Sequence, residues 1–167
     1  RRIAFLISDQ QLIPHGGVGQ FAKAFAEMCE QINWKVDFLM DKAPSSSLAD
    51  ELEGVTYIYP DKPLSYSEHT STFSFSDSIN FEKTINFRDV ILKAFSTNLY
   101  DLLVCNTTEA MTAAYSYSFN DLLPIVFYTH FHSMIFRDRN TNDVFVENFQ
   151  SFFNAHFDLP KVIIGTQ

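Results

Sequence analysis

The sequence is poor in basic residues and has no long apolar run. Its 12 Lys and Arg stand against 20 Asp and Glu, which gives a formal net charge of −8. Because non-specific binding to nucleic acid depends on clustered Lys and Arg that face phosphates, this balance argues against a broad DNA-binding surface. No apolar run approaches the roughly 20 residues that cross a bilayer, and the chain shows no pattern of a secretory leader. We therefore expect a cytoplasmic protein with no membrane span.

Cysteine is scarce as well. The two cysteines are Cys29, in a predicted helix, and Cys105, in a predicted buried strand. That placement favours two reduced thiols in the core over a disulfide. With 167 residues, 46% of them hydrophobic, the chain is long enough to bury one ordinary core. We therefore expect residues 1–167 to form a single domain.

Glycine is rare too, with 5 residues in the chain, yet Gly16, Gly17 and Gly19 fall close together. They follow an apolar run at 3–7, which is too short for a buried helix and is typical of a central parallel strand, and they precede a helical pattern over 18–32. Bare amides at a helix start, together with the helix dipole, favour an anion such as phosphate. The alternative is that the glycines only permit a tight turn and close packing of the helix.

Apolar stretches that indicate strands alternate with helical periodicities along the rest of the chain. Each parallel return in such a pattern needs a right-handed crossover. We therefore predict an α/β fold, with a doubly wound, Rossmann-like parallel sheet of about six strands. The stretch 61–80 is rich in Ser, Thr, Pro and aromatics and predicts a surface loop, either a lid that faces an acceptor or an insertion of no special role. The predicted strands cover 3–7, 36–40, 55–59, 101–106, 124–130 and 162–165, and the predicted helices cover 18–32, 81–99, 108–119 and 143–153.

Ligands of doubly wound sheets bind at the carboxyl ends of the strands, near the switch point beside the first strand. This rule selects polar residues after the first, fourth and fifth predicted strands as candidates for lining the substrate. They are Asp9, Asn106, Thr107, Glu109 and Ser133. All of them can meet the glycine loop in one crevice.

Two histidines, His130 and His132, follow the fifth predicted strand and alternate along an extended chain, so both rings would project to the same side. Three interpretations are open. The pair could act on the substrate, because imidazole titrates near neutral pH and its two nitrogens donate or accept protons. It could bind a metal, although no carboxylate or cysteine follows at ligand spacing. It could also form hydrogen bonds to the backbone alone. Our prediction is the first, with His130 and His132 as catalytic residues and no metal.

The order of these features resembles a known family. A strand is followed by the run 14–21, Pro-His-Gly-Gly-Val-Gly-Gln-Phe, and a later strand ends in the run 128–133, Tyr-Thr-His-Phe-His-Ser. This looks like the amino-terminal half of GT-B glycosyltransferases of the retaining, GT4-like type, and among them is most similar to phage enzymes that glucosylate DNA. Asn106 and Thr107 before an Ala-rich helix also resemble a segment of those enzymes. The resemblance covers essentially all of this chain but only about half of such an enzyme.

The resemblance implies a two-domain enzyme in which this chain is the acceptor-side domain and a following domain holds most of a nucleotide-sugar donor, with UDP-glucose the first choice. Gly16, Gly17 and Gly19 would face the donor diphosphate, and His130 would lie near the reacting sugar. The acceptor would be a hydroxyl group of 5-hydroxymethylcytosine in phage DNA or of a glycan. Those enzymes carry an acidic residue between the two histidines; here that position is Phe131, so no role of that carboxylate is carried over. The fragment alone is expected to fold without transferase activity.

Two other functions stay open on the residues alone. The chain could be a non-catalytic module that binds a nucleotide or phosphate on the same scaffold, because a fold does not settle function. It could also belong to a dinucleotide-dependent dehydrogenase, in which an acidic residue after the second strand binds a ribose. Asp41 stands at that position, but Gly16, Gly17 and Gly19 do not have the glycine spacing usual for those enzymes.

Overall fold

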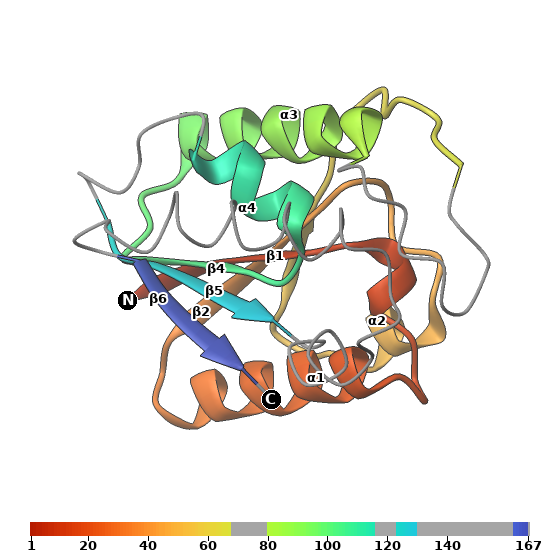
Figure 1. Ribbon diagram of the computed structural model, residues 1–167. Coiled ribbons are helices and arrows are strands. Elements are labelled where there is room, and N and C mark those ends of the chain that lie inside the picture. Colours follow the sequence, from red (N-terminus) through yellow and green to blue (C-terminus); the bar gives the residue numbers. More distant parts are fainter. Residues whose placement is uncertain (68–79, 116–122, 130–161, 167) are drawn as a thin grey trace, which may run out of the picture.

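The structure is a computed structural model and describes residues 1–67, 80–115, 123–129 and 162–166. The helix predicted over 143–153 lies outside these residues, as does most of the loop predicted over 61–80. Figure 1 shows the elements, whose bounds are β1 Arg2–Ile7, the 3-10 helix η1 Asp9–Gln11, α1 Gly17–Gln31, β2 Lys35–Met40, α2 Ser47–Glu51, β3 Thr56–Ile58, α3 Phe81–Thr97, β4 Leu102–Cys105, α4 Thr108–Tyr115, β5 Ile125–Thr129 and β6 Val162–Thr166.

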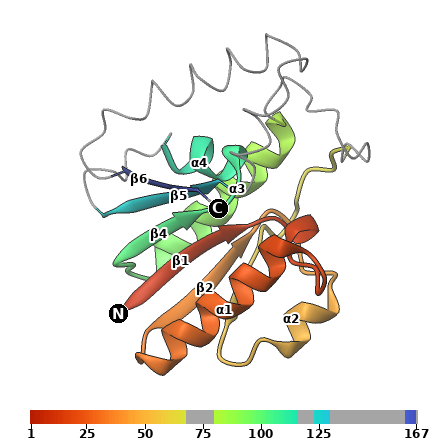
Figure 2. The same ribbon diagram turned by 60° about the horizontal axis from the view of Figure 1, so that its bottom comes forward.

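The six strands form one parallel sheet in the order β3-β2-β1-β4-β5-β6. The order reverses beside β1, which pairs with β2 on one side and with β4 on the other, as in Rossmann-like folds. In Figures 1 and 2, α1 and α2 cover one face of the sheet and α3 and α4 cover the other. The predicted doubly wound parallel sheet is confirmed, and so is the place of β3 at its edge.

Side chains of β1 alternate between two cores, one on each face of the sheet. Phe5 packs against Phe38 of β2 on the α1 face, with ring centroids 5.0 Å apart. Leu6 belongs to the core under α3 and α4. Because helices cover both faces, every residue from Ile3 to Ile7 is buried. This double burial explains why the strand is a continuous apolar run in the sequence rather than an alternating one.

An ion pair between a partly exposed arginine and a buried carboxylate joins β1 to β2. Arg2 Nε and Nη2 donate to the Asp37 carboxylate at 2.7 and 3.1 Å, and the Tyr100 hydroxyl donates to the same carboxylate at 2.7 Å. Hydrogen bonding to Asp37 raises the pKa of the Arg2 guanidinium, and burial, followed by the bond to Asp37, raises the pKa of the Tyr100 hydroxyl. The buried carboxylate is therefore both paired and hydrogen-bonded, as a charge in a core must be.

The segment that leaves β3 is fastened to α3. The side chain of Asn86, which is 0% exposed, accepts the Leu64 N–H at 2.7 Å and donates to the Leu64 carbonyl oxygen at 2.9 Å. Lys93 Nζ donates to the Tyr59 carbonyl oxygen at 3.0 Å. Part of the stretch predicted as a structureless loop is thus held in place by side chains of a helix that follows it in the chain.

Three further features bear on the sequence analysis. Cys29 and Cys105 are free and buried, as predicted. The short helices η1 and α2 have no counterpart among the predicted elements. No helix in the part of the chain that the structure describes is long and apolar enough to cross a membrane.

Candidate functional site

The predicted glycine loop follows η1 and runs into the first turn of α1, and its glycines serve different purposes. A Cβ atom at Gly19 would lie 2.2 Å from the Ile13 carbonyl oxygen, and one at Gly16 would lie 2.6 Å from Ile13 Cγ1. In the part of the chain that the structure describes, a Cβ atom at Gly17 would meet nothing within 4 Å. None of the three has a positive φ, so backbone freedom is not the reason for glycine here. Gly16 and Gly19 are explained by close packing on Ile13, whereas Gly17 is exposed and no described neighbour explains it.

The helices α1 to α4 all begin at the carboxyl edge of the sheet, and α1 begins differently from the others (Figure 1). Side-chain oxygens of Ser46, Asn80 and Thr107 cap α2, α3 and α4 by accepting backbone N–H groups at 3.1, 2.9 and 2.9 Å. These three helices also carry an acidic residue in the first turn, whereas α1 has Gly16 as its N-cap and no acidic residue there. Because the first amides of a helix have no partner within it and the dipole adds positive charge, the start of α1 suits an external anion.

Asp9, predicted to line the substrate, is 6% exposed and bonded to the loop that follows β2. Its carboxylate accepts hydrogen bonds from the backbone N–H and from the hydroxyl of Ser45, both at 2.7 Å, and lies 3.6 Å from Lys42 Nζ. These contacts hold the loops after β1 and β2 together. A contact between Asp9 and substrate stays a prediction.

Asp41, which follows β2, connects the segment after β3 to the loops that follow β1 and β2. Its carboxylate, which is 0% exposed, accepts the backbone N–H of Asp9 at 3.0 Å and the hydroxyl of Tyr66, in the segment that leaves β3. A dehydrogenase would need a carboxylate at this position for a ribose hydroxyl. Here the carboxylate is buried and bonded within the protein, which speaks against that alternative.

The residues predicted after the fourth strand also take part in internal hydrogen bonds. Asn106 Nδ2 donates to a carbonyl oxygen of β1 at 3.0 Å, and Gln11 Nε2 in η1 donates to the Asn106 carbonyl oxygen at 3.3 Å. Thr107 caps α4, and Glu109 accepts the backbone N–H of Asn80 at 3.3 Å. The loops after β1 and β4 thus meet at the switch point. Contacts of Asn106, Thr107 and Glu109 with substrate stay predictions.

His130, His132 and Ser133 lie outside the described residues. β5 ends at Thr129 and runs parallel to β4, so the chain leaves β5 at the same edge of the sheet as Asn106 leaves β4. The catalytic roles of the two histidines stay predictions. Within the described ranges, no group of three or more His, Cys, Asp and Glu side chains is placed to hold a metal ion.

Sequence reasoning did not single out Ile13, Ser45 or Tyr66 at this edge. Ser45 binds Asp9, 36 positions away in the chain, and Tyr66 binds Asp41, 25 positions away. No periodic pattern marks such pairs. A turn signal does mark Ser45, which stands in a serine run after a proline, but that signal points to a turn and not to a partner.

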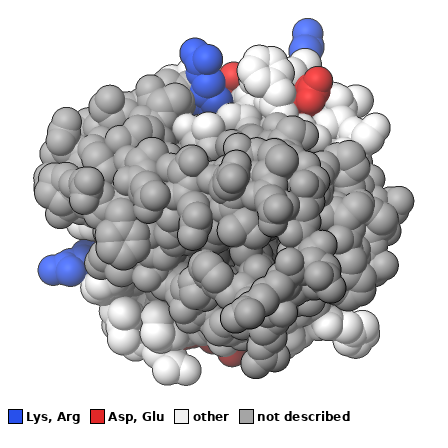
Figure 3. All heavy atoms as spheres, viewed as in Figure 1, with Lys and Arg blue, Asp and Glu red and all other residues white. Residues whose placement is uncertain are grey.

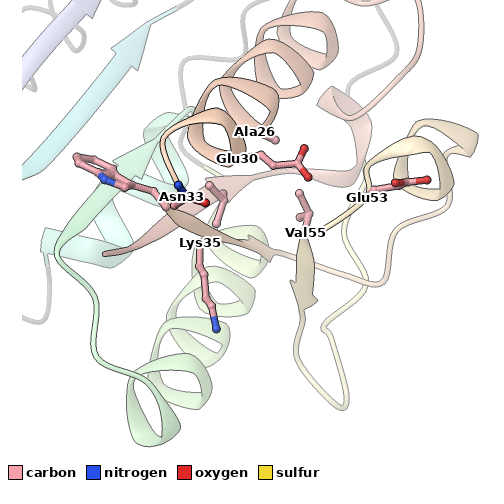
Figure 4. Close-up of a pocket in the computed structure, with 9 residues that line it drawn as sticks. Ala26, Glu30, Asn33, Lys35, Glu53 and Val55 are labelled. Carbon is pink, nitrogen blue, oxygen red and sulfur yellow. The ribbon is translucent and has the colours of Figure 1, made fainter.

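A pocket of about 390 Å³ lies at the opposite edge of the sheet, beside the C-terminal end of α1. Figure 4 shows Glu30 of α1, Glu53 of the turn before β3, and Val55 among the side chains that line it. None of the residues predicted from the sequence to form the site lines this pocket. It lies at the other end of α1 from Gly17, so it is not part of the candidate site.

No family model matches the sequence, and no curated protein does. Among solved structures, the chain is similar to a sucrose-phosphate synthase from Thermosynechococcus elongatus, with a TM-score of 0.61 and 11% sequence identity. The similarity covers 100% of this chain and 47% of that chain, so this chain spans about half the length of that protein. At this identity the similarity shows the fold alone. The chain has the Rossmann-like α/β fold of one half of a GT-B protein, as the sequence predicts.

Proposed function

We propose that the chain is the acceptor-side domain of a retaining glycosyltransferase that moves a sugar, glucose from UDP-glucose, to a hydroxyl group. The start of α1 carries this proposal, because it has neither a side-chain cap nor an acidic residue in its first turn and because no atom of the described residues would lie within 4 Å of a Cβ atom at Gly17. The diphosphate of a nucleotide sugar is an anion that such a helix start binds well. The fold similarity to half of a sucrose-phosphate synthase agrees with a role in glycosyl transfer.

In this proposal, the segment after β1 binds the donor, and residues after β5 carry out the chemistry. The first amides of α1 hold the donor diphosphate and stabilise the charge that develops on it as the bond to the sugar breaks. His130, predicted at the end of β5, hydrogen-bonds the sugar or takes the proton of the acceptor hydroxyl. His132 lies one step further along and orients the same loop. A second domain that follows this chain in the enzyme holds most of the nucleotide.

The acceptor hydroxyl belongs either to 5-hydroxymethylcytosine in DNA or to a glycan. The net charge of −8 gives DNA little general attraction to this domain. On the face shown in Figure 3, the Lys and Arg side chains of the described residues stand apart and form no patch. A base that is flipped into a pocket needs few basic residues in this half of an enzyme. Both acceptors are therefore included in the test.

The test uses the full-length protein, UDP-glucose, and two acceptors, a duplex that contains 5-hydroxymethylcytosine and an oligosaccharide. We expect transfer to one acceptor, and we expect Gly17→Val to weaken UDP-glucose binding at least about tenfold, because its side chain would enter the space in front of the helix amides. Glu27→Val is the matched control, since Glu27 is exposed on the same helix, away from its start.

Each result of this experiment has a definite meaning. UDP-glucose binding with no transfer to any acceptor would support the non-catalytic module instead. Equal UDP-glucose affinity of the wild type, Gly17→Val and Glu27→Val would overturn the assignment of the donor diphosphate to the start of α1.

A further inference from the structure

Two buried carboxylates lie next to each other at the carboxyl edge of the sheet. Asp9 is 6% exposed and has a cation nearby, since Lys42 Nζ lies 3.6 Å from its carboxylate. Asp41 is 0% exposed and forms no ion pair with any residue that the structure describes. Its Oδ1 accepts the Asp9 backbone N–H, and its Oδ2 accepts the Tyr66 hydroxyl. A buried carboxylate held by neutral donors costs stability, so stability alone does not explain Asp41.

The Tyr66 side chain is placed by contacts with two other parts of the chain. Lys42 Nζ lies 5.6 Å from the centroid of the Tyr66 ring and Lys83 Nζ of α3 lies 5.8 Å from it, both within cation–π range. Two positions earlier, both backbone groups of Leu64 are bonded to the Asn86 side chain of α3. The ring, and with it the hydroxyl, is therefore held by α3 as well as by the loop after β2.

The Asp9 N–H is the first amide of η1, and η1 leads directly to the glycine loop. The Asp9 carbonyl oxygen accepts the Leu12 N–H at 3.2 Å, and the Ile13 carbonyl oxygen accepts the Gly16 N–H at 3.2 Å. The same oxygen of Ile13 lies against Gly19 in the first turn of α1, where a Cβ atom would be 2.2 Å from it. A displacement of η1 would therefore be passed on to the start of α1.

We propose that Tyr66 is a positioning residue for the donor site and acts through Asp41. This inference rests on the proposed function, in which the amides at the start of α1 bind the diphosphate of UDP-glucose. The Tyr66 hydroxyl fixes one oxygen of the Asp41 carboxylate. The other oxygen holds the N–H of Asp9, and through it the start of η1. Tyr66 acts on the donor site without a contact to the donor.

The need for such an anchor follows from the glycines. Backbone amides bind an anion well when they are held in place beforehand, because ordering a loop on binding costs affinity. Gly16 and Gly17 have no side chains that could fix the loop, so its position depends on the residues before and after it. Asp41 fixes the segment before the loop, and Tyr66 fixes Asp41.

The binding test compares two Tyr→Phe variants of the full-length protein. We expect Tyr66→Phe to raise the Kd for UDP-glucose about five- to tenfold, because the anchor of η1 loosens. Tyr57→Phe is the matched control, since the Tyr57 hydroxyl donates to the Ala49 carbonyl oxygen at 3.1 Å and not to Asp41. The control should change this Kd less than about twofold, although each variant loses one hydrogen bond. Calorimetric titration measures the Kd.

Hydrogen exchange of the full-length protein reports on the anchor without any substrate. Backbone amides of residues 9–16 should exchange at least about fivefold faster in Tyr66→Phe than in the wild type, because local opening of η1 becomes easier. They should exchange at the wild-type rate in Tyr57→Phe. A role of Tyr66 in overall stability alone would not single out this segment.

Substitutions of Asp41 separate its hydrogen bonds from its charge. Asp41→Asn keeps an oxygen for the Asp9 N–H and can donate its amide to the Tyr66 oxygen, so its Kd for UDP-glucose should stay within about twofold of the wild type. Asp41→Ala loses both contacts and should weaken binding at least as much as Tyr66→Phe does. If Asp41→Ala does not fold, the comparison of Tyr66→Phe with Tyr57→Phe decides.

The outcomes separate this inference from the proposed function. A full-length wild type that does not bind UDP-glucose would overturn the proposed function, and the inference would fall with it. A wild type that binds UDP-glucose, together with equal affinities or equal exchange rates of Tyr66→Phe and Tyr57→Phe, would overturn only the role of Tyr66. Binding by Asp41→Asn as weak as that of Tyr66→Phe would also overturn it, because the charge of Asp41 and not its hydrogen bonds would then matter.

Discussion

The starts of α1 and α3 lie at the same edge of the sheet and are built in opposite ways. At α3, Asn80 caps the helix with its side chain, its own N–H is bonded to Glu109, and Glu82 stands in the first turn. At α1, Gly16 is the N-cap, the first turn has no acidic residue, and no atom of the described residues would lie within 4 Å of a Cβ atom at Gly17. The other three α-helices that the structure describes are capped by side chains of the chain itself. Among these described helices the start of α1 is the exception, and exceptions of this kind mark candidate ligand sites.

The largest effect on stability is expected at Gly19. A substitution there tests whether packing on Ile13 determines the shape of the glycine loop. Gly19→Ala should cost about 3 kcal/mol, because its Cβ atom would lie 2.2 Å from the Ile13 carbonyl oxygen and the backbone would have to move. Urea unfolding measures the loss. Gly17→Ala is the control and should stay within about 0.5 kcal/mol of the wild type. Equal stability of the two variants would mean that Gly19 is not held by packing.

A kinetic effect of similar size is expected at His130, the residue that we propose takes part in the chemistry. In the full-length protein, His130→Ala should lower kcat at least about 100-fold, or about 2.7 kcal/mol in barrier height, if a positioned proton transfer is lost. The melting temperature should hardly change, and His132→Ala should be milder. Steady-state kinetics and thermal melts together check this. Unchanged kcat with a lower melting temperature would assign His130 to structure.

A smaller effect is expected at the start of α3, where removal of the cap tests the comparison with α1 directly. Asn80→Ala should cost about 1 kcal/mol of stability, because the Lys83 N–H loses its acceptor. Asn80→Asp keeps an acceptor oxygen and serves as the control. Calorimetric titration of the full-length variants with UDP-glucose should give the wild-type affinity in both cases. Weaker UDP-glucose binding in Asn80→Ala would show that the two helix starts are not separate in function.

An effect no larger than that of Asn80→Ala is expected at alkaline pH and involves neither helix start. Burial, followed by the charge of Asp50, raises the pKa of the Tyr57 hydroxyl to about 12. Its pKa in the unfolded chain is near 10, so the folded state keeps a proton that the unfolded state loses. The stabilisation is complete below about pH 10 and is lost as the pH rises to about 12. The effect should be about 1 kcal/mol, given partial exposure to solvent.

Unfolding of the wild type and of Tyr57→Phe, measured between about pH 9 and pH 11, checks this expectation. The wild type should lose stability more steeply than the variant over that range. Parallel pH profiles of the two proteins would mean that Tyr57 does not keep its proton in the folded state.

Elements fixed by local pattern were predictable from the sequence. The run Ile3–Ile7 shows a buried parallel strand because both its faces are covered, and the helical spacing after the glycines predicts α1 to within one residue at each end. The short helix α2 was not predictable, because Ser47–Glu51 is too short to show a period. The doubly wound parallel sheet followed from the alternation of strands and helices, which permits few topologies, whereas the full order of its strands came from the structure.

The sequence predicted the location of the site but not the contacts within it. The strand-end rule brings Asp9 and Asn106 to one edge, and the structure connects their loops through Gln11. The rule could not show that the Asp9 carboxylate is bonded to Ser45, or that Gly16 and Gly19 are explained by Ile13. Such contacts join positions that no periodicity relates, so they become visible only when the chain is folded.

The double hydrogen bond between Asn86 and Leu64 has a consequence for protein engineering. Leu64 is anchored to α3 through both of its backbone groups, and Asn80 is anchored at the start of the same helix through its side chain and its N–H. Because the Leu64 side chain is 43% exposed while its backbone is held, Leu64→Cys offers a position for a fluorophore that reports on the attachment of this segment to α3.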